Sequence, residues 1–292
     1  MGLQEPPPLG AHALPEGTYR GETVVVTGGG TGLGKAIAVE FGRLGADVAI
    51  VSRQEEHRKA GVAAVEAVGA RAFSFAADIR QPETIAAAFD ALAEALGAPG
   101  HLVNNAAGNF PVPAEDLSPN GWRTVVDIVL NGTFFCSREL GRRAIADGRP
   151  ASIVNVGASY AWTGGPGFAH SAAAKAGVKN MTETLAVEWA PYGIRVNGLV
   201  PGLFPHEDET ADIQAVPGRG DRAAEEASCP AQRTGRLREL GWAATFLCSP
   251  YASYISGHTL VVDGVNWQRR AMRQPEFVPI REQMGKGPFS LD

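Results

Sequence analysis

The chain has few cysteines and no long apolar run, and each shortage argues against a class of protein. Its 292 residues include only three cysteines, Cys136, Cys229 and Cys248, which are odd in number and far apart. No CxxC or Cys/His spacing occurs, so we expect reduced, buried thiols and neither a disulfide framework nor a metal site. No apolar run approaches the roughly 18 residues of a membrane-spanning helix, so we expect no membrane partner.

Basic clusters and targeting signals are also missing. The formal net charge is −5 and no basic run stands out, which argues against nucleic acid as the main partner. Residues 5–10 are rich in proline and lack the apolar core of a secretory signal. The final residues, Ser290, Leu291 and Asp292, do not form a peroxisomal address. We therefore expect a cytoplasmic protein.

Short apolar runs alternate with helical patterns along most of the chain. The expected strands are residues 24–26, 48–51, 72–75, 102–104, 152–156, 194–200 and 259–263, and the expected helices include residues 55–68, 83–96, 121–145 and 171–190. Repeated strand–helix units with right-handed crossovers predict an α/β fold with a doubly wound parallel sheet of about seven strands and helices on both faces.

We expect one domain over residues 23–265, flanked by two extensions. Residues 1–22 contain several prolines and are predicted to be a surface or partly disordered tail. Residues 266–292 form a charged C-terminal extension that either wraps a neighbouring subunit or is a loose tail. Residues 203–235 interrupt the pattern with a long polar insertion, which is either a substrate lid or a disordered loop.

One stretch near the start predicts a nucleotide site. The strand at residues 24–26 leads into glycines at positions 28, 29, 30, 32 and 34, and apolar residues then recur at helical spacing. Glycine lets a pyrophosphate approach the backbone, and the helix N-terminus offers unpaired N–H groups. Gly-x-x-x-Gly-x-Gly is a variant of the dinucleotide fingerprint, although an ordinary strand–helix turn is the alternative.

The end of the second strand favours NADPH over NADH as the cofactor. An NAD enzyme places an acidic residue there to accept from the ribose 2′-hydroxyl group. This chain has Arg53 instead, which can pair with a 2′-phosphate through two hydrogen bonds.

Several motifs together resemble the short-chain dehydrogenase/reductase family. They are residues 27–34, residues 104–108, Asn131, Lys175 and the pair Pro201 and Gly202, in the family's order and spacing over about residues 22–265. The resemblance implies a Rossmann-type fold and a homotetramer. It also implies a set of cofactor contacts: Gly28, Gly30, Thr31, Gly32, Leu33, Gly34, Asp78, Asn105, Ala106, Lys175, Pro201, Gly202, Leu203 and Phe204.

The active-site pattern departs from the usual Tyr-x-x-x-Lys of that family. Ser171 stands four residues before Lys175, and a tyrosine occurs upstream at Tyr160. Together with residues 107–110 and 181–183, this displaced tyrosine resembles the NADPH-dependent 2,4-dienoyl-CoA reductases of fatty-acid β-oxidation, and the mitochondrial type in particular. The resemblance implies an acyl-CoA substrate that Arg80, Phe110, Ser118 and Tyr160 contact.

Different chemistry explains why the tyrosine can be displaced. Reducing a dienoyl thioester collects negative charge on the thioester oxygen, which needs hydrogen-bond donors, while water can protonate the carbon. By resemblance, Tyr160 and Asn109 donate to that oxygen and Lys175 holds the nicotinamide ribose. Ser171 orients the pair of Tyr160 and Lys175, and Asn131 supports Lys175 through water.

Alternative interpretations remain for several of these residues and for the function of the protein. Tyr160 could be a loop aromatic packed on Trp162, Asn109 could stabilise a turn, and Asn131 could be structural. Arg80 could be an ordinary surface residue. The rival functions are a carbonyl reductase of the same fold, for example on 3-oxoacyl thioesters, and a non-catalytic protein that binds NADP(H).

Overall fold

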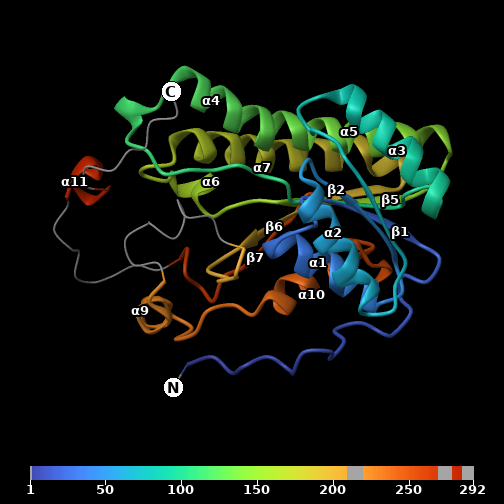
Figure 1. The fold of residues 1–292 in the computed structure, drawn as a ribbon, viewed down its shortest axis with the longest axis horizontal. Coiled ribbons are helices and arrows are strands. Elements are labelled where there is room, and N and C mark those ends of the chain that lie inside the picture. The colour runs from blue at the N-terminus through green and yellow to red at the C-terminus, as the bar shows by residue number, and fades with distance from the viewer. Residues whose placement is uncertain (1, 209–219, 269–277, 285–292) are drawn as a thin grey trace.

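The computed structural model of the chain describes residues 2–208, 220–268 and 278–284, and it contains one seven-stranded parallel sheet (Figure 1). The strand order is β3-β2-β1-β4-β5-β6-β7, and every neighbouring pair is parallel. The strands are β1 (Thr23–Thr27), β2 (Asp47–Val51), β3 (Ala72–Phe75), β4 (His101–Asn104), β5 (Ala151–Val156), β6 (Ile194–Pro201) and β7 (Thr259–Val262). The predicted fold class is confirmed.

Two layers of helices enclose the sheet. In Figure 1, α3, α4, α5 and α7 lie on one side of the sheet, and α1, α2 and α10 lie on the other. The α-helices are α1 (Gly32–Arg43), α2 (Glu55–Glu66), α3 (Pro82–Leu96), α4 (Pro119–Val126), α5 (Gly132–Ala146), α6 (Tyr160–Thr163), α7 (Ala169–Trp189), α9 (Arg222–Ser228), α10 (Leu237–Cys248) and α11 (Ile280–Met284). Short 3₁₀ turns occur at Ala114–Asp116, Ala190–Tyr192 and Pro250–Ala252.

The central strand β1 is buried on both faces, as its apolar sequence requires. Val24 and Val26 belong to the core cluster beneath α1 and α10, whereas Val25 belongs to the cluster beneath α3 and α5. Successive side chains of a strand point to opposite faces, so an unbroken run of valines serves both layers at once.

The predicted helix over residues 121–145 is present but is not uniform. It begins at Pro119, and a π-helical segment, Asp127–Asn131, separates α4 from α5. Such segments are rare and are found mostly at functional sites. This one carries Asn131, whose side-chain Nδ2 donates to Asp127 Oδ1 at 2.8 Å.

The expectation of a surface tail over residues 1–22 is wrong at its C-terminal end. Tyr19 is fully buried, its hydroxyl group donates to the Thr245 carbonyl oxygen, and its ring meets Phe41 edge to face. Before Tyr19, the chain runs across the α10 side of the molecule (Figure 1). Tyrosine buries a large apolar surface when its hydroxyl group finds a partner, which explains why this segment is ordered.

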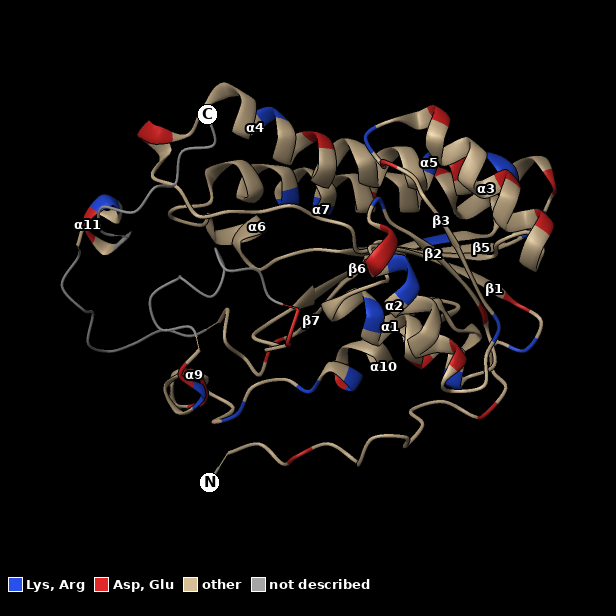
Figure 2. Ribbon diagram, viewed as in Figure 1, with Lys and Arg blue, Asp and Glu red and all other residues tan. Residues whose placement is uncertain are grey.

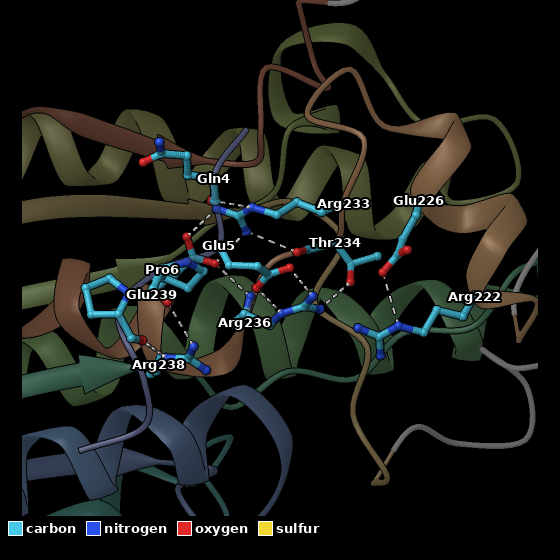
Figure 3. A network of polar contacts seen from close by, with 11 residues as sticks. Gln4, Glu5, Pro6, Arg222, Glu226, Arg233, Thr234, Arg236, Arg238 and Glu239 are labelled. Carbon is cyan, nitrogen blue, oxygen red and sulfur yellow. Dashed lines mark hydrogen bonds and ion pairs between the residues drawn. The ribbon is translucent and has the colours of Figure 1, made fainter. Parts of the chain in front are cut away.

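Three arginines hold the first residues against the segment that precedes and begins α10 (Figure 3). Arg233 donates to the Gln4 carbonyl oxygen, and Arg236 forms a two-bonded ion pair with Glu5. Arg238 donates to the carbonyl oxygens of residues 6 and 7. The N-terminal segment is thus attached to residues 233–238, which are far from it in the sequence.

Charged residues of both signs are interspersed along the outer helices α3 and α5 (Figure 2). Within the described ranges, no helix is both long enough and apolar enough to cross a membrane. The three cysteines are all buried and unpaired. Of the predicted lid and C-terminal extension, residues 209–219, 269–277 and 285–292 lie outside the described residues.

Candidate active site

The glycine-rich turn lies where the strand order reverses, between β1 and β4. The Thr27 hydroxyl oxygen accepts from the backbone N–H groups of Asn105 and Ala106, both at 3.1 Å. The Asn105 side chain donates back to the carbonyl oxygens of Thr27 and Gly28 at 3.2 Å. These bonds join the two loops that border the crevice, which is the expected place for a ligand in a sheet of this kind.

Close packing explains why glycine is needed in the turn. A Cβ atom on Gly34 would lie 2.3 Å from the Gly28 carbonyl oxygen, and one on Gly30 would lie 2.1 Å from the His57 carbonyl oxygen. Gly28 and Gly32 have φ angles of +64° and +48°, which favour glycine. The turn therefore keeps its backbone exposed to the crevice and lets α1 and α2 approach it.

The crevice is a cavity of about 640 Å³ that the glycine-rich turn and the ends of β2 and β3 border. It holds the N-terminus of α1, whose first backbone N–H groups have no partner within the helix and favour an anion. The predicted cofactor residues that line it are Gly28, Thr31, Gly32, Leu33, Arg53, Asp78, Asn105 and Ala106. Gly30 and Gly34 shape the turn from behind.

Arg53 and Asp78 lie at the end of the crevice formed by β2 and β3. The Arg53 side chain is more than half exposed, and its Nη1 lies 4.0 Å from Asp78 Oδ2. Arg80 is bound more tightly to the same carboxylate, with its Nε donating to both oxygens at 3.0 Å. Hydrogen bonding from Arg80 holds the pKa of Asp78 below its ordinary value, so the carboxylate stays charged. Arg53 thus keeps its guanidinium group available to a ligand.

None of the predicted nicotinamide contacts after β6, which are Pro201, Gly202, Leu203 and Phe204, lines the nucleotide crevice. Leu203 and Phe204 line a separate cavity of about 420 Å³ together with β7, and Phe204 is buried. The nucleotide crevice instead contains His206 and Asp208 from the next turn of the same segment. Both residues belong to the polar insertion 203–235 that the sequence analysis considers as a lid, but no local pattern assigns either of them to the nucleotide crevice.

Three predicted catalytic residues meet at the carboxyl ends of β4 and β5. The Tyr160 hydroxyl oxygen lies 3.0 Å from Ser171 Oγ, and Asn109 Nδ2 donates toward it at 3.5 Å. Asn109 Oδ1 accepts from the Phe110 backbone N–H at 3.0 Å, which fixes the orientation of the amide. Tyrosine therefore reaches from α6, and Ser171 fills the helix position that is four residues before Lys175.

Lys175 lies one turn beyond Ser171 on the same face of α7. Its side chain is buried, and Nζ donates to the Val156 carbonyl oxygen at 2.5 Å. Burial lowers the pKa of Lys175 to about 8. Burial also raises the pKa of Tyr160 above its ordinary value, although the Ser171 hydrogen bond opposes this, so the hydroxyl group stays protonated. A protonated Tyr160 is a hydrogen-bond donor rather than a base.

The remaining predicted residues contact neighbouring residues of the protein, and their predicted functional roles stay predictions. Ser118 Oγ accepts from the Gly121 N–H and caps α4. The Phe110 ring packs edge-on to His170 at 4.6 Å and joins an apolar cluster beneath α4 and α7. Asn131 bonds to Asp127, as described above. We find no direct bond between Asn131 and Lys175 among the described contacts.

Tyr160 does not pack on Trp162, which was the alternative reading of this tyrosine. Its ring lies parallel to that of Phe168 at 6.3 Å. Trp162 instead stacks on Trp267 at 5.3 Å, which ties α6 to the segment after β7. The sequence could not predict this contact, since the two tryptophans are more than a hundred residues apart.

The arrangement can hold a negatively charged oxygen beside a nucleotide. Tyr160 on α6 and Asn109 on the loop after β4 supply neutral donors, and Lys175 supplies a buried ammonium group one turn from Ser171 on α7. Preorganised donors of this kind stabilise charge that develops during a reaction.

Known proteins resemble the chain over most of its length. The family profile described as enoyl-(acyl carrier protein) reductase matches residues 28–264. A probable 2,4-dienoyl-CoA reductase of Bacillus subtilis is 42% identical over 250 residues, covering 84% of this chain and 96% of that protein. A peroxisomal 2,4-dienoyl-CoA reductase of Rattus norvegicus is 40% identical and covers 83% and 82% of the two chains. Among solved structures, a short chain dehydrogenase from Bacillus anthracis has a TM-score of 0.76 and 40% identity, covering 84% and 96%.

Proposed function

The chain belongs to the short-chain dehydrogenase/reductase family of oxidoreductases, and we propose that it reduces 2,4-dienoyl-CoA esters to enoyl-CoA with NADPH. The observation that carries this proposal is the cluster of Tyr160, Ser171 and Asn109. Tyr160 reaches the site from α6 and lies next to the Asn109 amide. Donors placed there can bond to a thioester oxygen that lies away from the position of the carbonyl oxygen in a carbonyl reductase. The relatives named 2,4-dienoyl-CoA reductase support the same reaction.

The proposed reaction adds a hydride to the far end of the diene, at C5 of the acyl chain. The C4–C5 double bond opens, and its electrons move along the conjugated system to the thioester oxygen. Tyr160 and Asn109 donate hydrogen bonds to that oxygen while it is negatively charged. Water then delivers a proton to carbon, and the electron pair returns from the oxygen to form the enoyl-CoA product.

Each residue of the cluster has one task in this proposal. The raised pKa of Tyr160 keeps its proton in place, so it stabilises the oxyanion without giving the proton up. Ser171 fixes the direction of the Tyr160 hydroxyl group. Lys175 binds the nicotinamide ribose and is itself oriented by the Val156 carbonyl oxygen.

NADPH supplies the hydride when bound, and Arg53 is the proposed reason that it is preferred to NADH. The guanidinium group lines the crevice at the end of β2, where a 2′-phosphate would lie. The carboxylate nearby, Asp78, is already bound to Arg80 and leaves Arg53 free to pair with phosphate.

We also propose that the protein is a homotetramer. Trp122 on α4 and Phe134 on α5 are exposed on the same outer layer of helices. A surface that another subunit covers carries exposed apolar area, to which these two side chains would contribute. Sedimentation analysis of the purified protein tests this directly.

The proposal is tested by the oxidation of NADPH, followed by its absorbance, with two substrates compared side by side. We expect turnover of trans-2,trans-4-decadienoyl-CoA and little turnover of acetoacetyl-CoA. Turnover of acetoacetyl-CoA alone would instead assign the protein to the carbonyl reductases. Binding of NADPH without turnover of either substrate would favour a non-catalytic role and contradict the proposal.

A further inference from the structure

A carboxylate of the chain itself occupies the anion-binding end of the nucleotide crevice. Asp208 Oδ2 accepts a hydrogen bond from the Gly32 backbone N–H at 2.7 Å, at the first residue of α1. The Lys35 ammonium group, one turn further along α1, lies 3.0 Å from the same carboxylate oxygen. Asp208 thus uses both the helix N-terminus and a nearby cation.

The rest of the segment reinforces this contact. The imidazole ring of His206 lies so close to Gly32 that a Cβ atom there would be 2.7 Å from the ring. Burial works against ionisation of Asp208, but the Gly32 N–H and Lys35 prevail and hold its pKa below the ordinary value. The carboxylate is therefore charged at neutral pH, and two residues of α1, Gly32 and Lys35, hold it.

The same N–H group is one that a dinucleotide needs. In a strand–glycine turn–helix unit, the pyrophosphate binds at the N-terminus of the helix, where unpaired backbone N–H groups point outward. A carboxylate and a pyrophosphate cannot both accept from the Gly32 N–H, and at this separation the two anions repel each other.

We propose that Asp208 is an internal competitor of the cofactor's pyrophosphate and sets the affinity of the site for the cofactor. This inference rests on the proposed nucleotide function of the crevice but does not depend on the identity of the substrate. Binding of the cofactor displaces Asp208 from Gly32. The apparent affinity for the cofactor is therefore reduced in proportion to the fraction of molecules in which Asp208 is bound to Gly32.

The test is direct binding of NADPH, followed by its fluorescence without any acyl-CoA present. We expect Asp208→Asn, and Asp208→Ala as a second variant, to bind NADPH about tenfold more tightly than the wild type, because a charge-assisted hydrogen bond no longer competes. Glu207→Gln is the matched control. Glu207 is the adjacent acid, is almost fully exposed and lies 3.8 Å from Lys35, so its variant should bind like the wild type.

A nucleotide without a pyrophosphate distinguishes two explanations of tighter NADPH binding. One is the loss of competition between Asp208 and the pyrophosphate, and the other is a general effect of the substitution on nucleotide binding in the crevice. Adenosine 2′-monophosphate, used to displace NADPH, should bind equally well to the wild type and to Asp208→Asn. Unchanged or weaker NADPH binding by Asp208→Asn would overturn the proposal, and so would an equal gain for adenosine 2′-monophosphate. A failure to reduce dienoyl-CoA would leave these results unaffected, since no turnover is measured.

Discussion

Single hydrogen bonds decide what the cluster around Tyr160 can do. The tyrosine keeps its proton because burial raises its pKa, and Asn109 is held with its amide group toward the same point by the Phe110 backbone. In the proposed reaction, both side chains act as neutral donors to an oxygen that becomes charged only during the reaction. Preorganised neutral donors favour the charged transition state over the neutral substrate.

Replacing Tyr160 with phenylalanine should remove one of these donors and leave the fold intact. We expect kcat for the dienoyl substrate to fall about 100-fold, with NADPH affinity unchanged, because the loss of one oxyanion donor affects the transition state. Steady-state kinetics and NADPH fluorescence measure the two quantities. Tyr254→Phe is the control, since Tyr254 is fully exposed. A Tyr160→Phe enzyme that retains wild-type kcat would rule out the proposed role.

At the level of helices and strands, local patterns predicted most of the fold. The valine run of β1, the glycine turn and the periodic apolar residues of α7 all specify structure within a few neighbouring residues, and these predictions are confirmed. What failed depends on distant partners. The burial of Tyr19, the Trp162–Trp267 stack and the Asp208–Gly32 contact each join residues far apart in sequence. No local pattern encodes such pairs.

The sequence also predicted part of the candidate active site. The resemblance to the 2,4-dienoyl-CoA reductases predicts a cluster of Tyr160, Asn109 and Ser171. The structure brings these three residues together. Their catalytic roles stay predictions. Ser118 is not identified as a helix cap in the sequence analysis, because the helix is expected there to begin at residue 121, although Ser followed by Pro119 is a typical helix start.

The end of β2 offers a test of cofactor choice. We expect Arg53→Ala to reduce the preference for NADPH over NADH about tenfold or more, because the 2′-phosphate loses a charge-assisted partner. The ratio of kcat/KM for the two cofactors measures the preference. Arg71→Ala is a suitable control, since Arg71 is paired with Asp47 away from the crevice. An unchanged ratio in Arg53→Ala would show that Arg53 does not bind the phosphate.

In the whole molecule, the candidate site lies at the carboxyl ends of the strands, and a network of polar and aromatic contacts lies at their amino ends. At these amino ends, His101 Nδ1 lies 2.7 Å from Ser152 Oγ, and its ring meets Tyr19 edge to face. Glu22 Oε2 lies 3.8 Å from His101 Nε2, and the positive charge of Arg195 acts on the ring. None of these residues lines the nucleotide crevice or contacts Tyr160, so we expect the network to affect stability rather than chemistry.

His101 should make the protein less stable in mild acid. Burial, with a smaller contribution from Arg195, lowers its pKa to about 4 in the folded chain, from 6.5 in the unfolded chain. Above pH 6.5 both states hold a neutral ring, so the stability is fully present. As the pH falls toward 4, the unfolded state binds a proton first, and the free energy of unfolding should drop by up to about 3 kcal/mol.

Urea denaturation at pH 7.5 and pH 5 measures this drop. We expect His101→Gln to have a smaller difference between the two pH values than the wild type, whereas a change at the exposed His12 should have no effect. An equal difference in wild type and His101→Gln would show that other groups carry the acid sensitivity.

The N-terminal segment should add a modest amount of stability. Deleting residues 2–8 removes the contacts with Arg233, Arg236 and Arg238 (Figure 3), and we expect Tm to fall by about 2–4 °C, since exposed ion pairs contribute little. Arg222→Ala is the matched control, because Arg222 pairs only with Glu226 among the described contacts in that cluster. An unchanged Tm after the deletion would mean that the segment is attached without stabilising the fold.

The most direct test of the central claim follows the hydride itself. NADPH carrying deuterium at the transferred position is incubated with trans-2,trans-4-decadienoyl-CoA, and the product is analysed by NMR. If the hydride is transferred as proposed, we expect one deuterium at C5 of the acyl chain, with the remaining proton taken from water. Absence of deuterium from C5, together with its transfer to C3 of a 3-oxoacyl-CoA in a parallel reaction, would contradict it and identify the protein as a carbonyl reductase.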